Sequence, residues 1–252
     1  MFFEKLIAIL VNYSKKECKE IYQKYLGKDY EIVYDKGFSS YICNHTSFVD
    51  SLLGIRYCQA GFISKESVKH SPFIGSIATG IQSLFVNRDK SASRTLILEQ
   101  IENRQKDYLE GRCFTPLIIF PEGTTTSNKH LLTFKKGAFN ALLPLKPMMI
   151  KNRDTEEFQI SAGSSDVMIN YIRGLTRLYT MIDFYELPVI KPTDYMFEHY
   201  SHLGKEKWEI YAEVCRNIYS EVGGFEKTQF GLRDSTRYTN CMDAKKYIEK
   251  ED

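Results

Sequence analysis

The chain lacks long apolar runs. No window of its 252 residues reaches the length of about 18 apolar residues that a membrane-spanning helix needs. The longest uncharged stretch, residues 71–87, is interrupted by Pro72, Gly75 and Gly80. Gly/Ser linkers, internal repeats and low-complexity segments are also missing, which argues against a disordered or repeat architecture.

An excess of one sign of charge is also missing, because 34 basic and 32 acidic side chains leave a formal net charge of only +2. Whole-molecule electrostatics therefore do not predict a nucleic-acid partner, and any anion site must be local. No two of the six cysteines are spaced as C-x-x-C, so we predict no metal site. We interpret the cysteines as reduced thiols of a protein that faces the cytosol.

What the chain does contain is an ordinary globular composition, with 43% hydrophobic and 26% charged residues. Its length allows one large domain or two small ones. The 17 tyrosines and 16 phenylalanines are consistent with a well-filled core, or with an apolar ligand groove or a membrane-facing surface.

Short apolar runs alternate with helical patterns along the chain. We predict strands at residues 40–43, 62–63, 84–86, 117–120, 148–150, 158–160 and 178–185. We predict helices from Ser47 and at residues 73–81, 93–110, 135–142 and 205–222. This alternation predicts a single α/β domain with a central, largely parallel or mixed sheet flanked by helices. Ligands of such sheets bind beyond the carboxyl ends of the strands.

The N-terminus predicts a helix over residues 2–26. Its apolar residues fall on roughly helical spacing, and Lys15, Lys16 and Lys19 follow them. The apolar positions are Phe2, Phe3, Leu6, Ile7, Ile9, Leu10 and Tyr13. The pattern fits a helix lying in a membrane interface, and equally a helix packed on the domain. We therefore divide the chain into an amphipathic N-terminal helix, residues 1–28, and a main domain, residues 29–252.

The segment NHTSFVD, residues 44–50, follows the strand predicted at residues 40–43. In one interpretation Ser47 caps a helix, Asp50 is half of a capping box and His45 is a polar loop residue. In the other, Asp50 orients one imidazole nitrogen of His45, and the second nitrogen takes a proton from a hydroxyl. The backbone N–H groups at the helix start would then suit a developing negative charge.

Cys43 lies two residues before His45, so a strand would place both on one face. A Cys–His pair acting through a covalent intermediate is one interpretation of this spacing. The other, which we favour, is that Cys43 is a small core residue.

A second polar segment, FPEGTTT at residues 120–126, follows the strand predicted at residues 117–120. It is either a tight turn with threonine caps or a loop that holds the polar part of a ligand. Lys129, Lys135 and Lys136 follow it and either contact phosphate or form a solvated basic face. Arg88, at another strand end, is also either a phosphate contact or a surface residue.

Four segments together resemble the PlsC-like glycerolipid acyltransferases, the lysophospholipid acyltransferase family. Residues 45–50 match the family's first motif and residues 120–124 match its third. Residues 84–88 look like the second motif, and residues 143–147 are similar to the proline-bearing fourth. The resemblance covers about residues 38–150, and the last hundred residues are similar only loosely.

The resemblance implies that residues 29–252 are an acyltransferase domain with acyl-CoA as co-substrate and no cofactor or metal. It implies that His45 is the general base, oriented by Asp50, in a direct transfer without a covalent enzyme intermediate. By the same resemblance, the acceptor would be positioned by Arg88, Glu122, Gly123, Thr124 and Thr125. Pro144 and Pro147 of the fourth motif would line the acyl side.

Two positions depart from the family pattern. Gln82 and Asn87 stand where the second motif usually carries glycine and aspartate, and Thr125 stands where phosphatidic-acid-forming members usually carry arginine. Without that arginine, a bare phosphomonoester would lose a bidentate partner. The resemblance is therefore greater to members that reacylate lysophosphatidylcholine or lysophosphatidylethanolamine.

Three functional hypotheses follow. The first is an acyl-CoA:lysophospholipid acyltransferase at a membrane surface, on the cytosolic face of the endoplasmic reticulum or another endomembrane. The second has the same chemistry with lysophosphatidic acid or glycerol 3-phosphate as acceptor. The third is a catalytically silent lipid-binding protein with the same fold.

Overall fold

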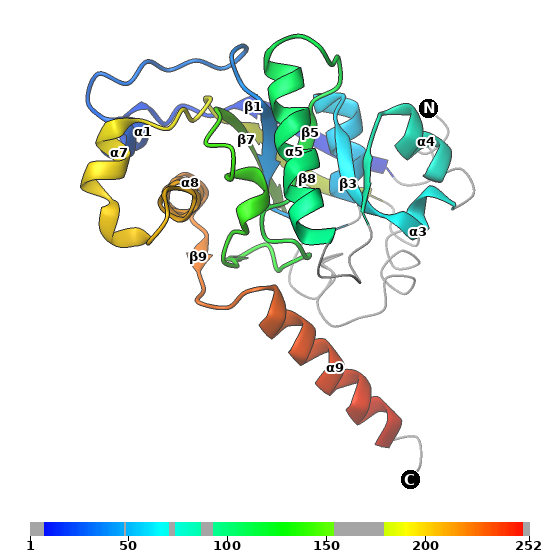
Figure 1. Ribbon diagram of the computed structural model, residues 1–252. Helices are drawn as coiled ribbons and strands as arrows, with labels where there is room; N and C mark the ends of the chain where they lie inside the picture. Colours follow the sequence, from blue (N-terminus) through cyan, green and yellow to red (C-terminus); the bar gives the residue numbers. More distant parts are fainter. Residues whose placement is uncertain (1–7, 48, 71–73, 87–92, 154–178, 249–252) are drawn as a thin grey trace.

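The protein is built around one mixed β-sheet (Figure 1). The computed structural model describes residues 8–47, 49–70, 74–86, 93–153 and 179–248. Within these residues, seven strands pair in the order β1-β8-β7-β2-β5-β3-β4. Their bounds are β1 Ala8–Lys15, β2 Ser40–Cys43, β3 Gly61–Lys65, β4 Leu84–Val86, β5 Leu117–Ile119, β7 Leu145–Asn152 and β8 Tyr179–Glu186.

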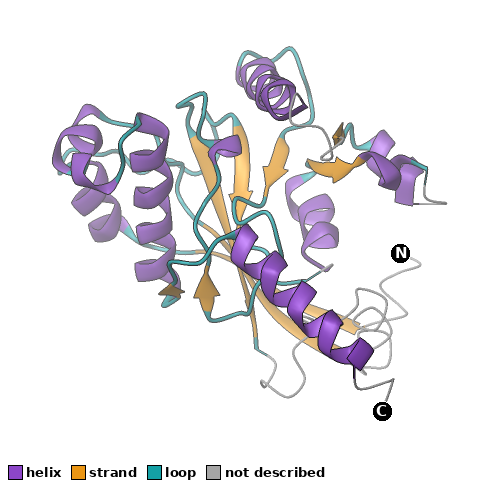
Figure 2. Ribbon diagram, turned by 60° about the horizontal axis from the view of Figure 1, so that its bottom comes forward, coloured by secondary structure: helices purple, strands orange, loops and turns teal. Residues whose placement is uncertain are grey.

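Neighbouring strands of this sheet run parallel, except for the antiparallel pair β7 and β8. The prediction of an α/β fold with a largely parallel or mixed sheet is therefore confirmed. Figure 2 shows helices on either side of the strands. They are α1 Lys19–Leu26, α2 Val49–Leu53, α3 Glu66–Lys69, α4 Ile74–Gly80, α5 Ser93–Leu109, α7 Asp194–His199, α8 Lys207–Gly223 and α9 Leu232–Ile248.

Alternate side chains of the central strands enter two cores, because successive residues of a strand point to opposite faces. On β2, Ile42 belongs to the core that contains α8 residues, and Cys43 belongs to the core that contains α2 residues. Tyr219 of α8 reaches the sheet itself, with its hydroxyl 2.8 Å from the carbonyl of Ile42 and 2.9 Å from that of Met148. This contact holds β2 and β7 just before the segment that carries His45.

Smaller elements complete the fold. A short parallel pair, β6 His130–Leu131 and β9 Glu226–Lys227, joins the segment after β5 to the segment after α8. The helix predicted at residues 135–142 is only a 3-10 turn, Lys136–Ala138. The predicted strand at residues 158–160 lies outside the described residues. Among the described helices, none has the length and apolar character needed to cross a membrane.

The predicted N-terminal helix over residues 2–26 is wrong for Ala8–Lys15, which form strand β1, and only Lys19–Leu26 are helical. β1 pairs along its whole length with β8, from Ala8 opposite Tyr179 to Lys15 opposite Glu186. The sequence AILV in this stretch also suits a strand, and pairing with β8 decides between the two states. Residues 8–15 are therefore part of the central sheet. The first seven residues lie outside the described ones.

Candidate active site

After β2 the main chain leaves the sheet, and the side-chain amide of Asn44 takes over the pairing with β7. Asn44 is buried, and its Oδ1 accepts a hydrogen bond from the Ile150 N–H at 2.8 Å. Its Nδ2 donates to the Ile150 carbonyl at 2.9 Å. Because this amide pairs with β7 as a backbone group would, the main chain is free to turn away at His45.

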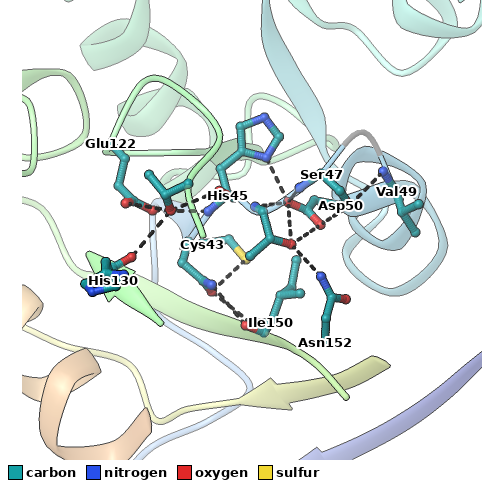
Figure 3. Close-up of polar contacts among 12 residues, drawn as sticks. Cys43, His45, Ser47, Val49, Asp50, Glu122, His130, Ile150 and Asn152 are labelled. Atoms are coloured by element: carbon teal, nitrogen blue, oxygen red, sulfur yellow. Dashed lines mark hydrogen bonds and ion pairs between the residues drawn. The ribbon is translucent and has the colours of Figure 1, made fainter. Parts of the chain in front are cut away.

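Asp50 is the centre of the turn that follows, with 0% exposure (Figure 3). Its Oδ2 accepts hydrogen bonds from Nδ1 of His45 at 2.8 Å and from the N–H groups of Thr46 at 2.5 Å and Ser47 at 2.9 Å. Its Oδ1 lies 3.1 Å from the Thr46 hydroxyl and 3.2 Å from the Ser47 hydroxyl. These donors offset the cost of burying a carboxylate.

These contacts define how the imidazole ring of His45 is held. When Nδ1 carries the proton and donates it to Asp50, Nε2 is left as the acceptor nitrogen. The ring also stacks on Phe120, with 4.0 Å between the centroids and 16° between the planes. The His45 side chain keeps 20% of its surface exposed. The ring is therefore oriented by a hydrogen bond and by an aromatic neighbour, and it remains accessible.

The contacts expected from both interpretations of residues 44–50 are present, and proton transfer to His45 stays a prediction. The Ser47 hydroxyl accepts from the Val49 N–H at 3.3 Å, and Asp50 accepts from the Ser47 N–H, as in a capping box. The same carboxylate orients His45. The N–H groups of Thr46 and Ser47 also donate to Asp50. A role for the helix start at a developing negative charge stays a prediction.

Cys43 is a core residue. Its side chain is fully buried and belongs to the cluster that contains Val49 and Leu53. Burial raises the pKa of the Cys43 thiol well above its ordinary value, so the reactive thiolate is disfavoured. These facts favour a core role for Cys43 over the covalent Cys–His interpretation.

Glu122 is also fully buried, and its carboxylate contacts the backbone of the site. Oε1 accepts from the N–H of His45 at 3.2 Å, and Oε2 accepts from the N–H of Leu132 at 2.9 Å and from the Thr126 hydroxyl at 3.2 Å. Burial raises the pKa of Glu122 to about 7, and the three hydrogen bonds act in the opposite direction. Glu122 thus ties the His45 backbone to the segment after β5.

A second hydrogen bond joins the same two segments, because the Thr126 N–H donates to the His45 carbonyl at 2.8 Å. Both backbone groups of His45 are therefore held by residues of the FPEGTTT segment. The contact between Glu122 and an acceptor, which the family resemblance implied, stays a prediction.

Gly123 has φ of +74°, in the left-handed region that favours glycine. A methyl group on its Cα would also overlap with Nζ of Lys135. The N–H of Lys135 donates to the Pro121 carbonyl at 2.9 Å, which fixes the lysine beside this turn. Glycine is therefore required here by backbone conformation and by the close approach of the lysine side chain.

His45 lies in the wall of a cleft with a volume of about 930 Å³. The apolar wall comes from β3, β4, α5 and β5: Ile63, Val86, Ile97, Leu98, Ile101, Ile118 and Ile119. The polar wall comes from the segment after β5 and from the start of α9: Gly123, Thr124, Thr133, Lys135, Lys136, Gln229, Arg233 and Asp234. The cleft thus offers an apolar surface and several cationic groups to a single amphipathic ligand.

The other predicted site residues lie in different places. Arg88 falls outside the described residues, and Thr125 is not among the described residues of the cleft wall. Pro144 and Pro147 are not in the described wall either. The Pro144 carbonyl accepts from Ser39 at 2.8 Å and the Pro147 carbonyl accepts from Leu187 at 3.1 Å, so both support β7.

The structure also adds residues that the sequence did not single out for the site. Phe120 stacks on His45, Asn44 anchors the segment, and Arg233 reaches the cleft from the C-terminal helix. Within the described ranges, no three His, Cys, Asp or Glu side chains gather in a way that could hold a metal ion. All six cysteines are free thiols.

Comparison with known proteins gives matches to acyltransferases. A family model described as Acyltransferase matches residues 28–151. The lysophospholipid acyltransferase LPEAT1 of Arabidopsis thaliana is 27% identical over 198 residues, which are 78% of this chain and 48% of that protein. The lysophosphatidylcholine acyltransferase 1 of Homo sapiens is 26% identical over 192 residues, 75% of this chain and 34% of that protein. The chain therefore spans less than half the length of these relatives.

Among solved structures, the chain is similar to the 1-acyl-sn-glycerophosphate (LPA) acyltransferase PlsC from Thermotoga maritima. The match has a TM-score of 0.47 and 20% sequence identity, and it covers 86% of this chain and 71% of that one.

Proposed function

We propose that the protein transfers a fatty acyl group from acyl-CoA to the free hydroxyl of a lysophospholipid, since a family model described as Acyltransferase matches residues 28–151. The observation that carries this proposal is that His45, paired with the buried Asp50, lies in the wall of a cleft with apolar and cationic surfaces. A long acyl chain and a phosphate-bearing group need both kinds of surface in one site.

The chemistry starts at Nε2 of His45. This nitrogen takes the proton of the acceptor hydroxyl while the hydroxyl oxygen attacks the thioester carbonyl. The new C–O ester bond forms, the C–S bond breaks, and the proton passes from the imidazolium to the sulfur of the leaving coenzyme A. Asp50 stabilises the imidazolium between these two proton transfers.

The proposed acceptor is lysophosphatidylcholine or lysophosphatidylethanolamine. Thr125 in place of the usual arginine supports this choice, as do the names of the relatives, a lysophospholipid acyltransferase and a lysophosphatidylcholine acyltransferase. The rival acceptors are lysophosphatidic acid and glycerol 3-phosphate, and the rival class is a silent lipid-binding protein.

The experiment is acyl transfer from labelled oleoyl-CoA to a panel of these four acceptors, with wild type beside His45→Ala. We expect His45→Ala to lower the rate by roughly 10²–10⁴-fold, which is the range for loss of a general base. His199→Ala, on α7, is the matched control and should retain the wild-type rate. Product formed only from lysophosphatidic acid or glycerol 3-phosphate would overturn the acceptor assignment, and a folded, active His45→Ala protein would overturn the mechanism.

We place the protein at a membrane surface, on the cytosolic face of the endoplasmic reticulum or another endomembrane. The support is the proposed acceptor, which is a membrane lipid, together with six free thiols that suit a reducing compartment. Deleting residues 1–26 would remove β1 from the sheet, so the test uses the full chain. We expect it to float with phosphatidylcholine vesicles, and recovery only in the unbound fraction would count against this placement.

A further inference from the structure

The first turn of α9 belongs to the wall of the active-site cleft, although it lies far beyond the family motifs in sequence. Leu232, Arg233 and Asp234 line the cleft that contains His45. Figure 1 shows that the rest of α9 extends away from the sheet. The helix thus meets the site only through its beginning.

Backbone hydrogen bonds hold this beginning in place. The N–H of Thr228 donates to the Leu131 carbonyl at 3.0 Å, and the N–H of Thr133 donates to the Phe230 carbonyl at 3.0 Å. Arg216 of α8 donates to the Leu131 carbonyl at 2.9 Å and also to the carbonyl of Thr228. The segment that leads into α9 is therefore fastened beside the segment that follows the FPEGTTT motif.

The helix start is also fixed locally. Oδ2 of Asp234 accepts from the Gly231 N–H at 2.9 Å, as the third residue of a helix does in a capping box. A side chain at Gly231 would come within 2.8 Å of Oγ1 of Thr133, so this turn packs closely on the cleft segment. The backbone of Arg233 is therefore held at a defined place in the cleft wall.

Arg233 brings a third cation to the polar wall, beside Lys135 and Lys136. Lys135 lies against Gly123, and Lys136 is 3.4 Å from Glu206 and lies over the Trp208 ring. Asp234, the acid among the described wall residues, already accepts the Gly231 N–H. The wall thus carries an excess of positive charge.

From this arrangement we infer that Arg233 binds a phosphate group of a substrate and, with Lys135, forms the anion subsite of the cleft. The inference rests on the proposed function, since both proposed substrates carry phosphate. A guanidinium presents a planar fork that matches phosphate oxygens, whereas a lysine acts as a point charge.

Steady-state kinetics of Arg233→Gln, with lysophosphatidylcholine and oleoyl-CoA varied in turn, test the inference. We expect the KM of one substrate to rise by about tenfold with a smaller change in kcat, as for loss of a charge-assisted hydrogen bond. The affected substrate identifies whether the phosphate belongs to the lipid or to coenzyme A. Arg233→Lys should recover part of the loss.

Arg237→Gln is the matched control, because Arg237 lies one turn further along α9, is exposed and is not among the described wall residues. It should behave as wild type. Unchanged KM values for both substrates in Arg233→Gln, or an equal effect of Arg237→Gln, would overturn the inference.

A second readout does not need turnover. Calorimetric titration with free coenzyme A, and separately with lysophosphatidylcholine below its micellar concentration, compares binding to the wild type and the two glutamine variants. If wild type binds one probe and Arg233→Gln binds it about tenfold more weakly, the anion subsite stands even if no acyl transfer occurs. If acyl transfer occurs while both the affinities and the KM values are unchanged in Arg233→Gln, the proposed function is supported and the proposal of an anion subsite is wrong.

Discussion

Two fully buried carboxylates meet at the active-site segment, and they act on different parts of the same residue. Asp50 accepts from the imidazole of His45 and so determines the direction of the ring. Glu122 accepts from the backbone N–H of His45 and so determines where the residue itself lies. Although both acids belong to motif-like segments, one orients the imidazole of His45 and the other positions the chain that carries it.

The surroundings of the two acids explain the division. Asp50 lies in the turn that contains its own donors, all from residues 45–47. Glu122 collects donors from three separate places along the chain: His45, Thr126 and Leu132. A change at Asp50 should therefore affect chemistry first, and a change at Glu122 should affect the relative placement of two segments.

The largest effect among the acid substitutions is expected for Asp50→Asn. An amide offers one acceptor oxygen in place of two, and its NH₂ group would face the N–H groups of Thr46 and Ser47 or the proton on Nδ1 of His45. We expect kcat to fall by roughly 10²–10⁴-fold, because the wrong tautomer is favoured. The measurement is kcat with oleoyl-CoA and the best acceptor, accompanied by thermal unfolding.

Asp107→Asn, at a half-exposed position of α5, serves as the control for loss of a carboxylate. If Asp50→Asn retained the wild-type kcat, Asp50 would be a helix cap only, and the contrast between the two acids would disappear.

A smaller loss of activity is expected for Glu122→Gln. The glutamine NH₂ group would face either the His45 N–H or the Leu132 N–H, so the two segments must shift apart slightly. Displacement of a catalytic group on this scale lowers kcat by about 10–100-fold. Separate kcat and KM values for the acceptor measure it.

The split between kcat and KM also distinguishes the two roles of Glu122. A fall in kcat with little change in the acceptor KM is expected for a positioning residue. A rise in the acceptor KM with kcat unchanged would instead mean that Glu122 contacts the acceptor, as the family resemblance implied.

The smallest expected effect is on stability rather than activity. It concerns how the contribution of Glu122 to the free energy of unfolding depends on pH. Its pKa rises from 4.5 to about 7 on folding, so the folded protein holds the proton more tightly than the unfolded chain. This contribution to stability is complete below pH 4.5 and is lost as the pH rises through 7. The corresponding free energy is at most about 3 kcal/mol.

Denaturant unfolding of the wild type and Glu122→Gln at several pH values between 4.5 and 8 measures this effect. We expect the wild type to lose stability relative to the variant as the pH rises, since glutamine does not titrate. If the free energy of unfolding changed with pH in the same way for both proteins, Glu122 would not titrate in this range.

The local parts of the site could be predicted from the sequence, because they depend on short-range geometry. Asp50 is close enough to His45 in sequence that one turn brings the carboxylate to the ring, and the spacing predicted this contact as one of two interpretations. The short apolar runs before His45 and Glu122 likewise predicted strands β2 and β5. At these places local propensity and the fold agree.

The errors and omissions concern contacts between distant parts of the chain. Ala8–Lys15 has apolar spacing that suits a helix, and only pairing with β8 makes it a strand. Arg233 reaches the cleft because β9 pairs with β6, and neither short strand has a strong sequence signal. The hydrogen bond of Glu122 with the Leu132 backbone depends on how the chain folds back at Leu132, which the residues of the motif do not determine.

The pairing of β1 with β8 has a consequence for synthesis on the ribosome. Because Lys15 lies opposite Glu186, this edge of the sheet cannot close until translation has passed Glu186. Until then, the β1 segment has no β8 strand to pair with, and its apolar side chains can associate with non-native partners. Although β1 precedes the other six strands of the described sheet in sequence, it is thus among the last of them to be paired.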